Sequence, residues 1–296
     1  MKVLLTGSEG QLGKALINSL PDEIDLLSTN RSELDLSKPN DCYDYIINNK
    51  PDWVINSGAY TAVDKAEEDH ILTNLVNSEA PTCFAKALKK TGGKLIQIST
   101  DFVFNGKQNK PYMTNQKTDP LGNYGMSKAK AEKSILNILQ NSNQVFILRT
   151  SWLMGPIGNN FLLTMLRLHS EKENINVIED QIGCPTTTHS LARACWRVLI
   201  LSQNEKFLPS ILHWRDSGIA SWFDVAMAIG ELGVKCGKLK KSAIVNPIST
   251  SQYPTAAKRP HYSVLDCKTT IDNIGINNNY WRYELEEVIK SVSIKY

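Results

Sequence analysis

The chain has 296 residues, of which 42% are hydrophobic and 21% are charged, and its formal net charge at pH 7 is +3. This composition is typical of a soluble globular protein with one large domain or two interleaved domains. The near-neutral balance, with Lys and Arg in isolated pairs such as Lys89-Lys90 rather than in long blocks, argues against nucleic acid as a partner.

Cysteines and apolar stretches indicate the compartment. The six cysteines are scattered, without a Cys-x-x-Cys pair or a nearby His at metal-ligand spacing, so we expect reduced thiols. The chain starts directly with an apolar run at 2–6, which leaves no room for a signal peptide. No apolar stretch approaches the roughly 20 residues of a membrane-spanning helix. We therefore expect a cytoplasmic protein without a membrane partner.

The first half of the chain alternates short apolar runs with helical patterns. This alternation predicts parallel strands joined by right-handed crossovers, that is, an α/β fold with a Rossmann-like, doubly wound parallel sheet. Gly92-Gly93 predicts the end of the longest helix. The predicted strands are Val3–Thr6, Ile24–Ser28, Trp53–Asn56, Lys94–Ser99 and Val145–Arg149, and the predicted helices are Leu12–Leu20, Asn40–Asn49, Leu72–Thr91 and Ser127–Asn141.

The alternation becomes irregular after about residue 150. Segments rich in turn-forming residues separate further helical patterns at Phe161–His169, Ser190–Leu201 and Trp222–Leu232. We predict a dinucleotide-binding domain at residues 1–150 and a smaller substrate domain formed mainly by residues 151–296, with some segments returning to the first domain. The smaller domain is expected to lean over the carboxyl ends of the strands.

Three glycines follow the first predicted strand and open the first predicted helix: Gly7, Gly10 and Gly13. Glycines in this position allow the backbone to approach a pyrophosphate closely, and the positive end of the helix attracts the phosphate charge. A tight turn without a ligand is the alternative interpretation. The strand before and the helix after both favour a nucleotide site.

The residues after the second predicted strand indicate the cofactor. An acidic residue there would bind the ribose 2′-hydroxyl of NAD, whereas an arginine accommodates the 2′-phosphate of NADP. Asn30 is neutral and Arg31 is cationic, so we predict NADPH, with NADH use left open and a surface role for Arg31 as the other interpretation. The loops at Asp35-Leu36 and Ser57–Thr61 should line the adenine and nicotinamide sides.

Tyr124 and Lys128 lie four residues apart at the start of a predicted helix and therefore on one face. A ketone that accepts a hydride must also receive a proton. A neighbouring ammonium favours the phenolate form of a tyrosine, which brings the pKa of this acid nearer to the working pH. Thr100, at the end of the fourth predicted strand, can donate a hydrogen bond to the ketone oxygen. We predict that these three residues are catalytic; a tyrosine beside a solvated lysine is the alternative.

With these motifs and several others, the chain resembles the dTDP-4-dehydrorhamnose reductase family of extended short-chain dehydrogenases/reductases. The resemblance implies reduction of the C4 ketone of dTDP-4-dehydro-L-rhamnose with NADPH, for surface polysaccharide synthesis, and a dTDP-sugar as the partner. It covers nearly the whole chain, through the segments Thr6–Gly13, Ala62–Glu67, Ser99–Phe104, Tyr124–Lys128, Arg149–Trp152, Gly158–Phe161, Asp180–Thr186 and Tyr253–Pro260.

The resemblance also implies individual roles. Tyr124 would donate the proton with Lys128 as its partner, and Thr100 would polarise the carbonyl group of the substrate. Thr100, Asp101 and Trp152 would contact the substrate, although Trp152 by composition alone is a core residue, and the segment 180–186 is expected in the sugar-nucleotide pocket. The implied cofactor contacts, in addition to the glycines, are Gln11, Leu12, Asn30, Asp35, Leu36, Ala59, Tyr60, Thr61, Tyr124 and Lys128.

Two positions depart from the family pattern. Asn30 replaces the Asp of some members, which argues against strict NADH use. His189 stands where some relatives carry a Glu in a metal-linked dimer contact; a lone His supports no such site, so we predict no metal. The oligomeric state stays open, with a homodimer as one alternative.

Other functions of the same superfamily share part of this pattern. Sugar-nucleotide dehydratases carry a second acid directly after the Thr-Asp pair, but here Asp101 is followed by Phe102. Another nucleotide-sugar 4-ketoreductase or an epimerase is the alternative within the superfamily. A non-catalytic NADP-binding regulatory subunit is the alternative from another class, against which the intact set of Thr100, Tyr124 and Lys128 argues.

Overall fold

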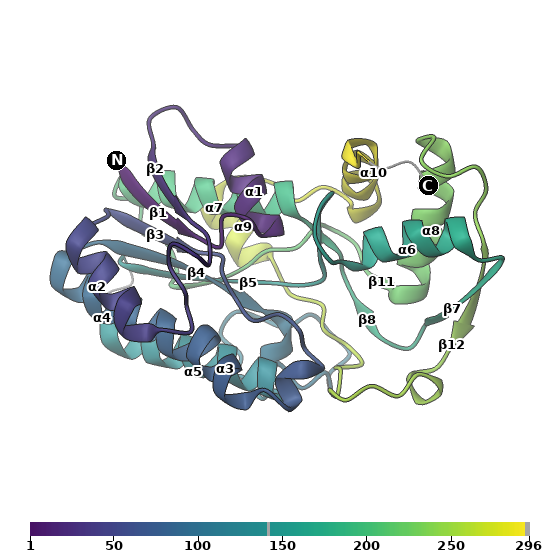
Figure 1. The fold of residues 1–296 in the computed structure, drawn as a ribbon, viewed down its shortest axis with the longest axis horizontal. Helices are drawn as coiled ribbons and strands as arrows, with labels where there is room; N and C mark the ends of the chain where they lie inside the picture. Colours follow the sequence, from purple (N-terminus) through teal and green to yellow (C-terminus); the bar gives the residue numbers. More distant parts are fainter. Residues whose placement is uncertain (141–142, 294–296) are drawn as a thin grey trace.

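The computed structural model describes residues 1–140 and 143–293, and within them the largest sheet has six strands in the order β10-β5-β4-β3-β1-β2, all parallel (Figure 1). The doubly wound parallel sheet predicted above is therefore confirmed. Its strands are β1 (Lys2–Thr6), β2 (Asp25–Thr29), β3 (Trp53–Asn56), β4 (Lys94–Thr100), β5 (Val145–Thr150) and β10 (Ile211–His213).

Helices cover both faces of this sheet (Figure 1). One face carries α1 (Gln11–Asn18), α7 (Thr188–Gln203) and α9 (Lys268–Ile274), with Leu16 and Trp196 in the shared core. The other face carries α2 (Pro39–Asn49), α4 (Ala80–Thr91) and α5 (Asn123–Leu139), with Phe84 and Ile135 in the core. Because both faces are covered, β3 and β5 are buried along their whole length, which explains their continuous apolar runs.

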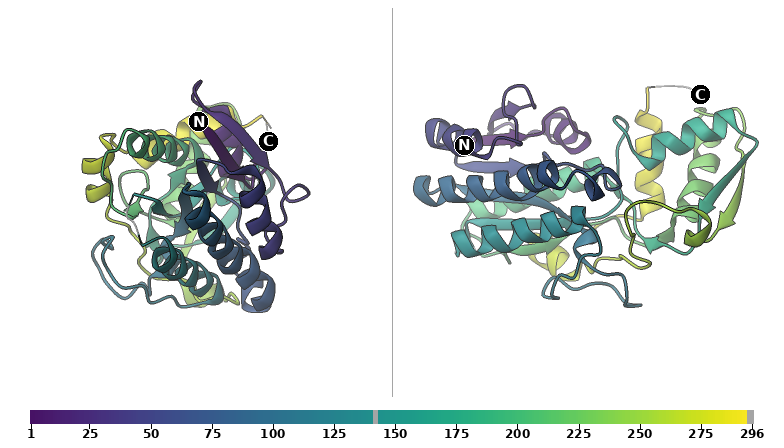
Figure 2. Two further views of the ribbon diagram at one scale, coloured as in Figure 1. Left: turned by 90° about the vertical axis from the view of Figure 1, so that its left-hand side faces the viewer. Right: turned by 60° about the horizontal axis from the view of Figure 1, so that its bottom comes forward.

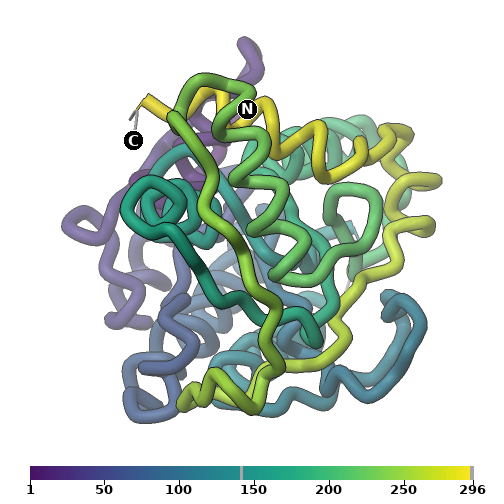
Figure 3. Tube along the Cα trace, turned by 90° about the vertical axis from the view of Figure 1, so that its right-hand side faces the viewer, coloured from purple at the N-terminus to yellow at the C-terminus, as the bar shows by residue number. Residues whose placement is uncertain are grey.

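A second group of elements has its own core beside the carboxyl edge of the sheet (Figures 1 and 2). We call it the second part, and the six-stranded sheet with its helices the sheet part. It consists of α6 (Phe161–Glu171), α8 (Trp222–Lys235), α10 (Trp281–Ser291) and the parallel pair β7 (Asn174–Ile178) and β12 (Ile244–Ile248). Figure 3 looks onto this part, with β12 in green crossing its face. A domain boundary near residue 150 stays a prediction.

Short elements connect the two parts. β6 (Leu153–Met154) pairs with β9 (Thr186–Thr187), and β8 (Ile182–Gly183) pairs with β11 (Ala220–Ser221). The chain returns from the second part to the sheet part to form α7, β10 and α9, which the sequence patterns do not fully predict. The remaining short helices are η1 (Lys65–Glu67), η3 (Asp101–Val103) and η4 (Thr250–Gln252).

The helix predicted at Leu72–Thr91 is interrupted. It consists of α3 (His70–Asn74), a π-helical turn η2 (Leu75–Glu79) and α4, which ends at Gly92 with φ 85° as expected. The helix predicted at Ser127–Asn141 begins earlier, at Asn123, and residue 141 lies outside the described residues. None of the helices in the described ranges is long and apolar enough to cross a membrane.

Candidate active site

One large cavity of about 530 Å³ lies where the second part meets the carboxyl ends of the sheet. The strand order reverses between β1 and β3, and ligands of such folds bind in the crevice at this point. The sheet part contributes residues that follow β1, β3, β4 and β5, and the second part contributes Asn159, Asn160, Trp222 and Arg259. The cavity thus has walls from both parts of the molecule.

The glycine turn forms one end of this cavity. Gly7 has φ +69°, and a Cβ atom there would lie 2.7 Å from the Cα atom of Gly58, so the ends of β1 and β3 approach each other without side chains between them. Gly10, Gln11 and Leu12 line the cavity where α1 begins. Unpaired backbone N–H groups at a helix N-terminus bind anions, so this turn fits a pyrophosphate.

A smaller pocket of about 230 Å³ continues the crevice beyond β2 and shares Gly7, Gly58 and Ala59 with the large cavity. The amide oxygen of Asn30 accepts the backbone N–H groups of residues 32 and 33, at 2.8 and 3.2 Å, which shapes a tight loop. The Arg31 guanidinium lies 3.7 Å from Asp35, and its side chain is 78% exposed. The predicted cofactor residues in this pocket are Asn30, Arg31, Asp35, Leu36, Ala59 and Tyr60.

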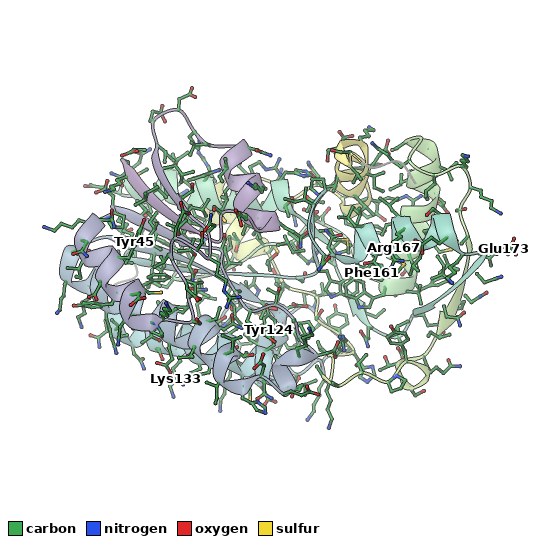
Figure 4. All side chains as sticks on the ribbon, in the orientation of Figure 1. Tyr45, Tyr124, Lys133, Phe161, Arg167 and Glu173 are labelled. Carbon is green, nitrogen blue, oxygen red and sulfur yellow. The ribbon has the colours of Figure 1, made fainter. Side chains whose placement is uncertain are left out.

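The predicted acid and its partner line the large cavity from α5, together with Thr61 from the opposite loop. The Lys128 ammonium is buried and donates a hydrogen bond of 2.6 Å to the carbonyl oxygen of Ile98. Burial lowers the pKa of Lys128 to about 8, although the charge of Glu132 acts in the opposite direction. Figure 4 places Tyr124 toward the centre of the molecule, with Lys133 farther out on the same helix.

The direction that we expected for the pKa of Tyr124 is wrong in this structure. Burial raises the pKa of Tyr124 to about 12, and the hydrogen bond with Thr100 only partly opposes this rise. Desolvation of the phenolate is the largest cause, the Asp101 charge adds to the rise, and Lys128 is not among the groups that shift this pKa. At neutral pH the phenol keeps its proton, which is the state that a proton donor needs.

Thr100 and Asp101 complete this wall at the end of β4. The Thr100 hydroxyl accepts the backbone N–H of Phe102 and donates to a carboxylate oxygen of Asp101, both at 3.1 Å. Burial raises the pKa of Asp101 to about 6. The ring of Phe102, at the position of a dehydratase's second acid, packs edge-on against Tyr124 with 5.7 Å between centroids.

A buried ion pair lies behind these residues. The Arg149 guanidinium donates to both carboxylate oxygens of Glu132, at 2.6 to 3.2 Å, and Ser99 donates to the same carboxylate. The ring of His213 lies 3.3 Å from Arg149, and burial lowers the pKa of His213 to about 3, so the ring is neutral. These contacts fix α5, one turn beyond Lys128, to β4 and β5.

Sequence reasoning missed Asn77 in the π-helical turn. Its buried amide accepts the backbone N–H of Tyr60 at 2.8 Å and donates to the Tyr60 carbonyl at 3.0 Å and to the Ser127 hydroxyl at 3.2 Å. It therefore joins the loop at Ser57–Thr61, which is predicted to line the nicotinamide side, to the helix that carries Tyr124. Single-turn π-helices often occur at functional sites, but no residue pattern in the sequence signals this one.

Trp152 lines the cavity from the loop after β5 and also packs against the core of the second part, so its contact with the substrate stays a prediction. Its backbone is left-handed, with φ 45°, and its indole stacks on Trp222 at 3.6 Å between centroids and 10° between planes. A Cβ atom at Gly183 would lie 2.5 Å from the Trp152 ring, so this contact requires a glycine.

The segment 180–186 lies next to the cavity wall, and its expected place in the sugar-nucleotide pocket stays a prediction. Among the described residues that line the cavity, none belongs to this segment. Instead, Gly183 supports the Trp152 ring, and the Thr186 N–H donates to the Trp152 carbonyl at 3.2 Å. The segment therefore shapes the cavity wall from behind.

Arg259 reaches the cavity from the loop after η4 and holds the two parts together. Its guanidinium donates to both carboxylate oxygens of Asp64, at 2.7 and 3.0 Å, and Asp64 also accepts the Ala257 N–H at 3.0 Å. These contacts lower the pKa of Asp64. Both partners belong to segments that carry the resemblance, but no local pattern shows that they meet.

The His189 ring contacts the carboxylate of Glu284, at the start of α10. Glu284 also accepts a hydrogen bond from the Asn279 amide at 2.5 Å, and these contacts lower its pKa. Across residues 1–140 and 143–293, no group of three or more His, Cys, Asp or Glu side chains is arranged to hold a metal ion.

A doubly wound parallel sheet with a glycine turn at its switch point, beside Thr, Tyr and Lys side chains in one cavity, is typical of the NAD(P)-dependent short-chain dehydrogenases/reductases. The family model for the RmlD substrate binding domain matches residues 1–294. The dTDP-4-dehydrorhamnose reductase of Burkholderia thailandensis is 37% identical over 290 residues, with 96% of each chain covered.

Solved structures agree. A dTDP-4-dehydrorhamnose reductase from Clostridium acetobutylicum matches with a TM-score of 0.91 and 32% identity, over 99% of this chain and 100% of that one. The reductase from Bacillus anthracis in complex with NADP matches with a TM-score of 0.87 and 33% identity, over 97% and 98%. The chain belongs to the RmlD family of dTDP-4-dehydrorhamnose reductases, which confirms the resemblance found in the sequence.

Proposed function

We propose that this protein reduces the C4 ketone of dTDP-4-dehydro-L-rhamnose to dTDP-L-rhamnose with NADPH, in the cytoplasm, for surface polysaccharide synthesis. One observation carries the proposal: the glycine turn, the side chains of Thr100, Tyr124 and Lys128, and the Trp152 ring all line a single cavity. The names of the relatives, and the NADP complex of one of them, support the substrate and the cofactor.

The residues at the end of β4 and the start of α5 handle the proton. When bound, NADPH supplies the hydride for the ketone carbon. Tyr124 holds a proton on its phenol oxygen for delivery to the ketone oxygen, and a pKa of about 12 keeps that proton in place at neutral pH. The Thr100 hydroxyl turns its single proton from Asp101 to the same ketone oxygen when the substrate is bound. Lys128, with a pKa of about 8, is mostly charged at pH 7 and stabilises the phenolate left behind.

The other walls hold the rest of the two ligands. The Trp152 indole offers a flat apolar surface to the sugar ring, and the buried Asp101 carboxylate accepts a hydrogen bond from a sugar hydroxyl. Asn30 and Arg31 line the far end of the crevice and would hold the ribose and 2′-phosphate of NADPH there. Binding energy from the nucleotide then orients the ketone for reaction.

The test is direct turnover. The purified protein is incubated with NADPH and dTDP-4-dehydro-L-rhamnose, the loss of NADPH absorbance is followed, and the product sugar is identified by NMR. We expect equimolar NADPH oxidation and dTDP-L-rhamnose. A 6-deoxy-talose product would instead assign the chain to a different 4-ketoreductase. Folded protein that binds NADPH but does not oxidise it with this substrate would contradict the proposal and favour a regulatory subunit.

A further inference from the structure

The side chain of Gln11 makes contacts that its place in the glycine turn does not explain. Gln11 is the first residue of α1, and with Gly10 and Leu12 it lines the cavity at the proposed pyrophosphate end. Its amide, however, is directed into the second part. The amide oxygen accepts the backbone N–H of Gly155 at 3.0 Å and the side-chain N–H of Asn160 at 2.7 Å. These partners lie 144 and 149 residues away along the chain.

The loop that Gln11 holds is organised by Asn160. The Asn160 amide nitrogen also donates to the carbonyl oxygens of Gly155 at 2.9 Å and Ile157 at 3.1 Å, and its oxygen accepts the Leu163 N–H at 3.0 Å, which caps α6. A Cβ atom at Gly158 would lie 3.1 Å from the Cγ atom of Gln11, so the loop also packs on the aliphatic part of this side chain. The Gln11 amide oxygen therefore joins the glycine turn to the loop at residues 155–160 and, through Asn160, to helix α6.

The same loop belongs to the sugar side of the cavity. It follows Trp152 by way of the short strand β6, and Trp152, Asn159 and Asn160 line the cavity. A dinucleotide bound at the N–H groups of Gln11 and Leu12 restricts the first turn of α1. Because the Gln11 amide oxygen is fixed to the loop, the same restriction orders the wall that faces the sugar.

We propose that Gln11 is a positioning residue that couples the cofactor site to the sugar-nucleotide site through its contacts with Gly155 and Asn160. This inference rests on the proposed function for the identity of the two ligands. The free-energy cost of ordering the loop is then incurred when the first ligand binds. The second ligand therefore binds more tightly than it would in the absence of the first. By thermodynamic linkage, each ligand strengthens the binding of the other by the same factor.

Calorimetry measures this coupling without turnover. NADPH and dTDP-L-rhamnose are both in the reduced state, so no hydride passes between them. The Kd of dTDP-L-rhamnose is measured for the full chain with and without saturating NADPH. We expect NADPH to tighten this binding by about fivefold or more, within the usual range of coupling between sites. The reverse titration should give the same ratio.

Two variants remove the contact in different ways. Gln11→Ala deletes the acceptor, and Asn160→Asp deletes the donor while a carboxylate oxygen still accepts the Leu163 N–H and caps α6. In both variants the ratio of the two Kd values should fall close to one. Ile157→Ala is the matched control, because this side chain belongs to the same loop but is 40% exposed; it should keep the wild-type ratio.

The outcomes separate the two proposals. A ratio of one in the wild-type protein, or an unchanged ratio in Gln11→Ala and Asn160→Asp, overturns the coupling while the proposed function stands. The two variants could instead weaken dTDP-L-rhamnose binding equally with and without NADPH, so that the ratio of the two Kd values is retained. That result shows that the contact is only structural, and it also overturns the coupling. A wild-type protein that does not bind dTDP-L-rhamnose in either state contradicts both the substrate class and the coupling.

Discussion

The two ends of the crevice differ in how much water surrounds their polar groups. At the catalytic end Thr100, Asp101 and Lys128 are 6%, 1% and 3% exposed. At the far end the Arg31 side chain is 78% exposed and pairs loosely with Asp35. Burial shifts the pKa of Tyr124 upward and that of Lys128 downward. The buried end is therefore suited to proton transfer. The solvent-exposed end around Arg31 is suited to discrimination between NADPH and NADH.

The same difference sets the size of mutational effects. A buried polar group interacts in a low dielectric and has no water to replace a lost partner, whereas an exposed ion pair contributes about 0 to 1 kcal/mol. We therefore expect effects on turnover to decrease from the end of β4 toward the loop after β2.

Tyr124→Phe should have the largest effect. Loss of the phenol removes the proton that the ketone oxygen receives, so kcat should fall by about 10²- to 10⁴-fold with little change in NADPH affinity. Steady-state kinetics and NADPH titration measure the two quantities. Tyr45→Phe, on α2 at the far side of the sheet part (Figure 4), is the control and should behave as wild type. Near-normal turnover of Tyr124→Phe would remove this residue from the mechanism.

The pH dependence tests Lys128 at the same end. Its pKa is lowered to about 8, so the ammonium is charged below this pH and loses its proton above it. Because the charged form assists the tyrosine, kcat/KM should fall as the pH rises through about 8 and approach tenfold per pH unit above it. The Lys128→Ala variant should turn over slowly, and its kcat/KM should not decrease in this pH range. A wild-type profile that is flat from about pH 7 to pH 9 would contradict the assignment.

Trp152→Ala probes the wall formed by the loop after β5, where the Trp152 ring stacks on Trp222 of the second part. Loss of the indole removes the flat surface that faces the sugar, so kcat/KM for the sugar nucleotide should fall at least about tenfold, equivalent to about 1.4 kcal/mol. NADPH affinity and the melting temperature should change little. Tyr283→Ala, an aromatic side chain on α10 that is 69% exposed, is the matched truncation control. Unchanged sugar kinetics would return Trp152 to a structural role.

Arg31→Ala should have the smallest effect. The side chain is exposed and already near Asp35, so its removal should weaken NADPH binding by only about three- to tenfold, with NADH binding unchanged. Cofactor titrations measure both constants. Arg167→Ala, which removes an exposed arginine paired with Glu171 in the second part, should affect neither cofactor. Equal weakening of both cofactors would show that Arg31 is structural.

Local patterns predict the sheet part well. Apolar runs and turn residues locate β1 to β5, and the glycine turn with Tyr124 and Lys128 lies on the cavity as predicted. These features depend on neighbours within a few residues, which the sequence displays directly. The roles of these residues in catalysis stay predictions.

The remaining features depend on distant contacts. The Asp64–Arg259 pair and the Trp152–Trp222 stack join residues far apart in the chain. The π-helical turn around Asn77 interrupts a regular helical pattern, and the pKa of Tyr124 is decided by burial rather than by its neighbour in sequence. None of these can be deduced from spacing.

The edge strand β10 has a consequence for the synthesis of the chain. It pairs with β5 through residues 211–213, after the chain has built α6, β7 and α7. Until these residues leave the ribosome, the outer edge of β5 presents free backbone groups, which is the kind of edge that promotes association between chains. We expect nascent chains arrested before β10 to aggregate, and chains extended past α9, which also packs against β10, to become protease-resistant.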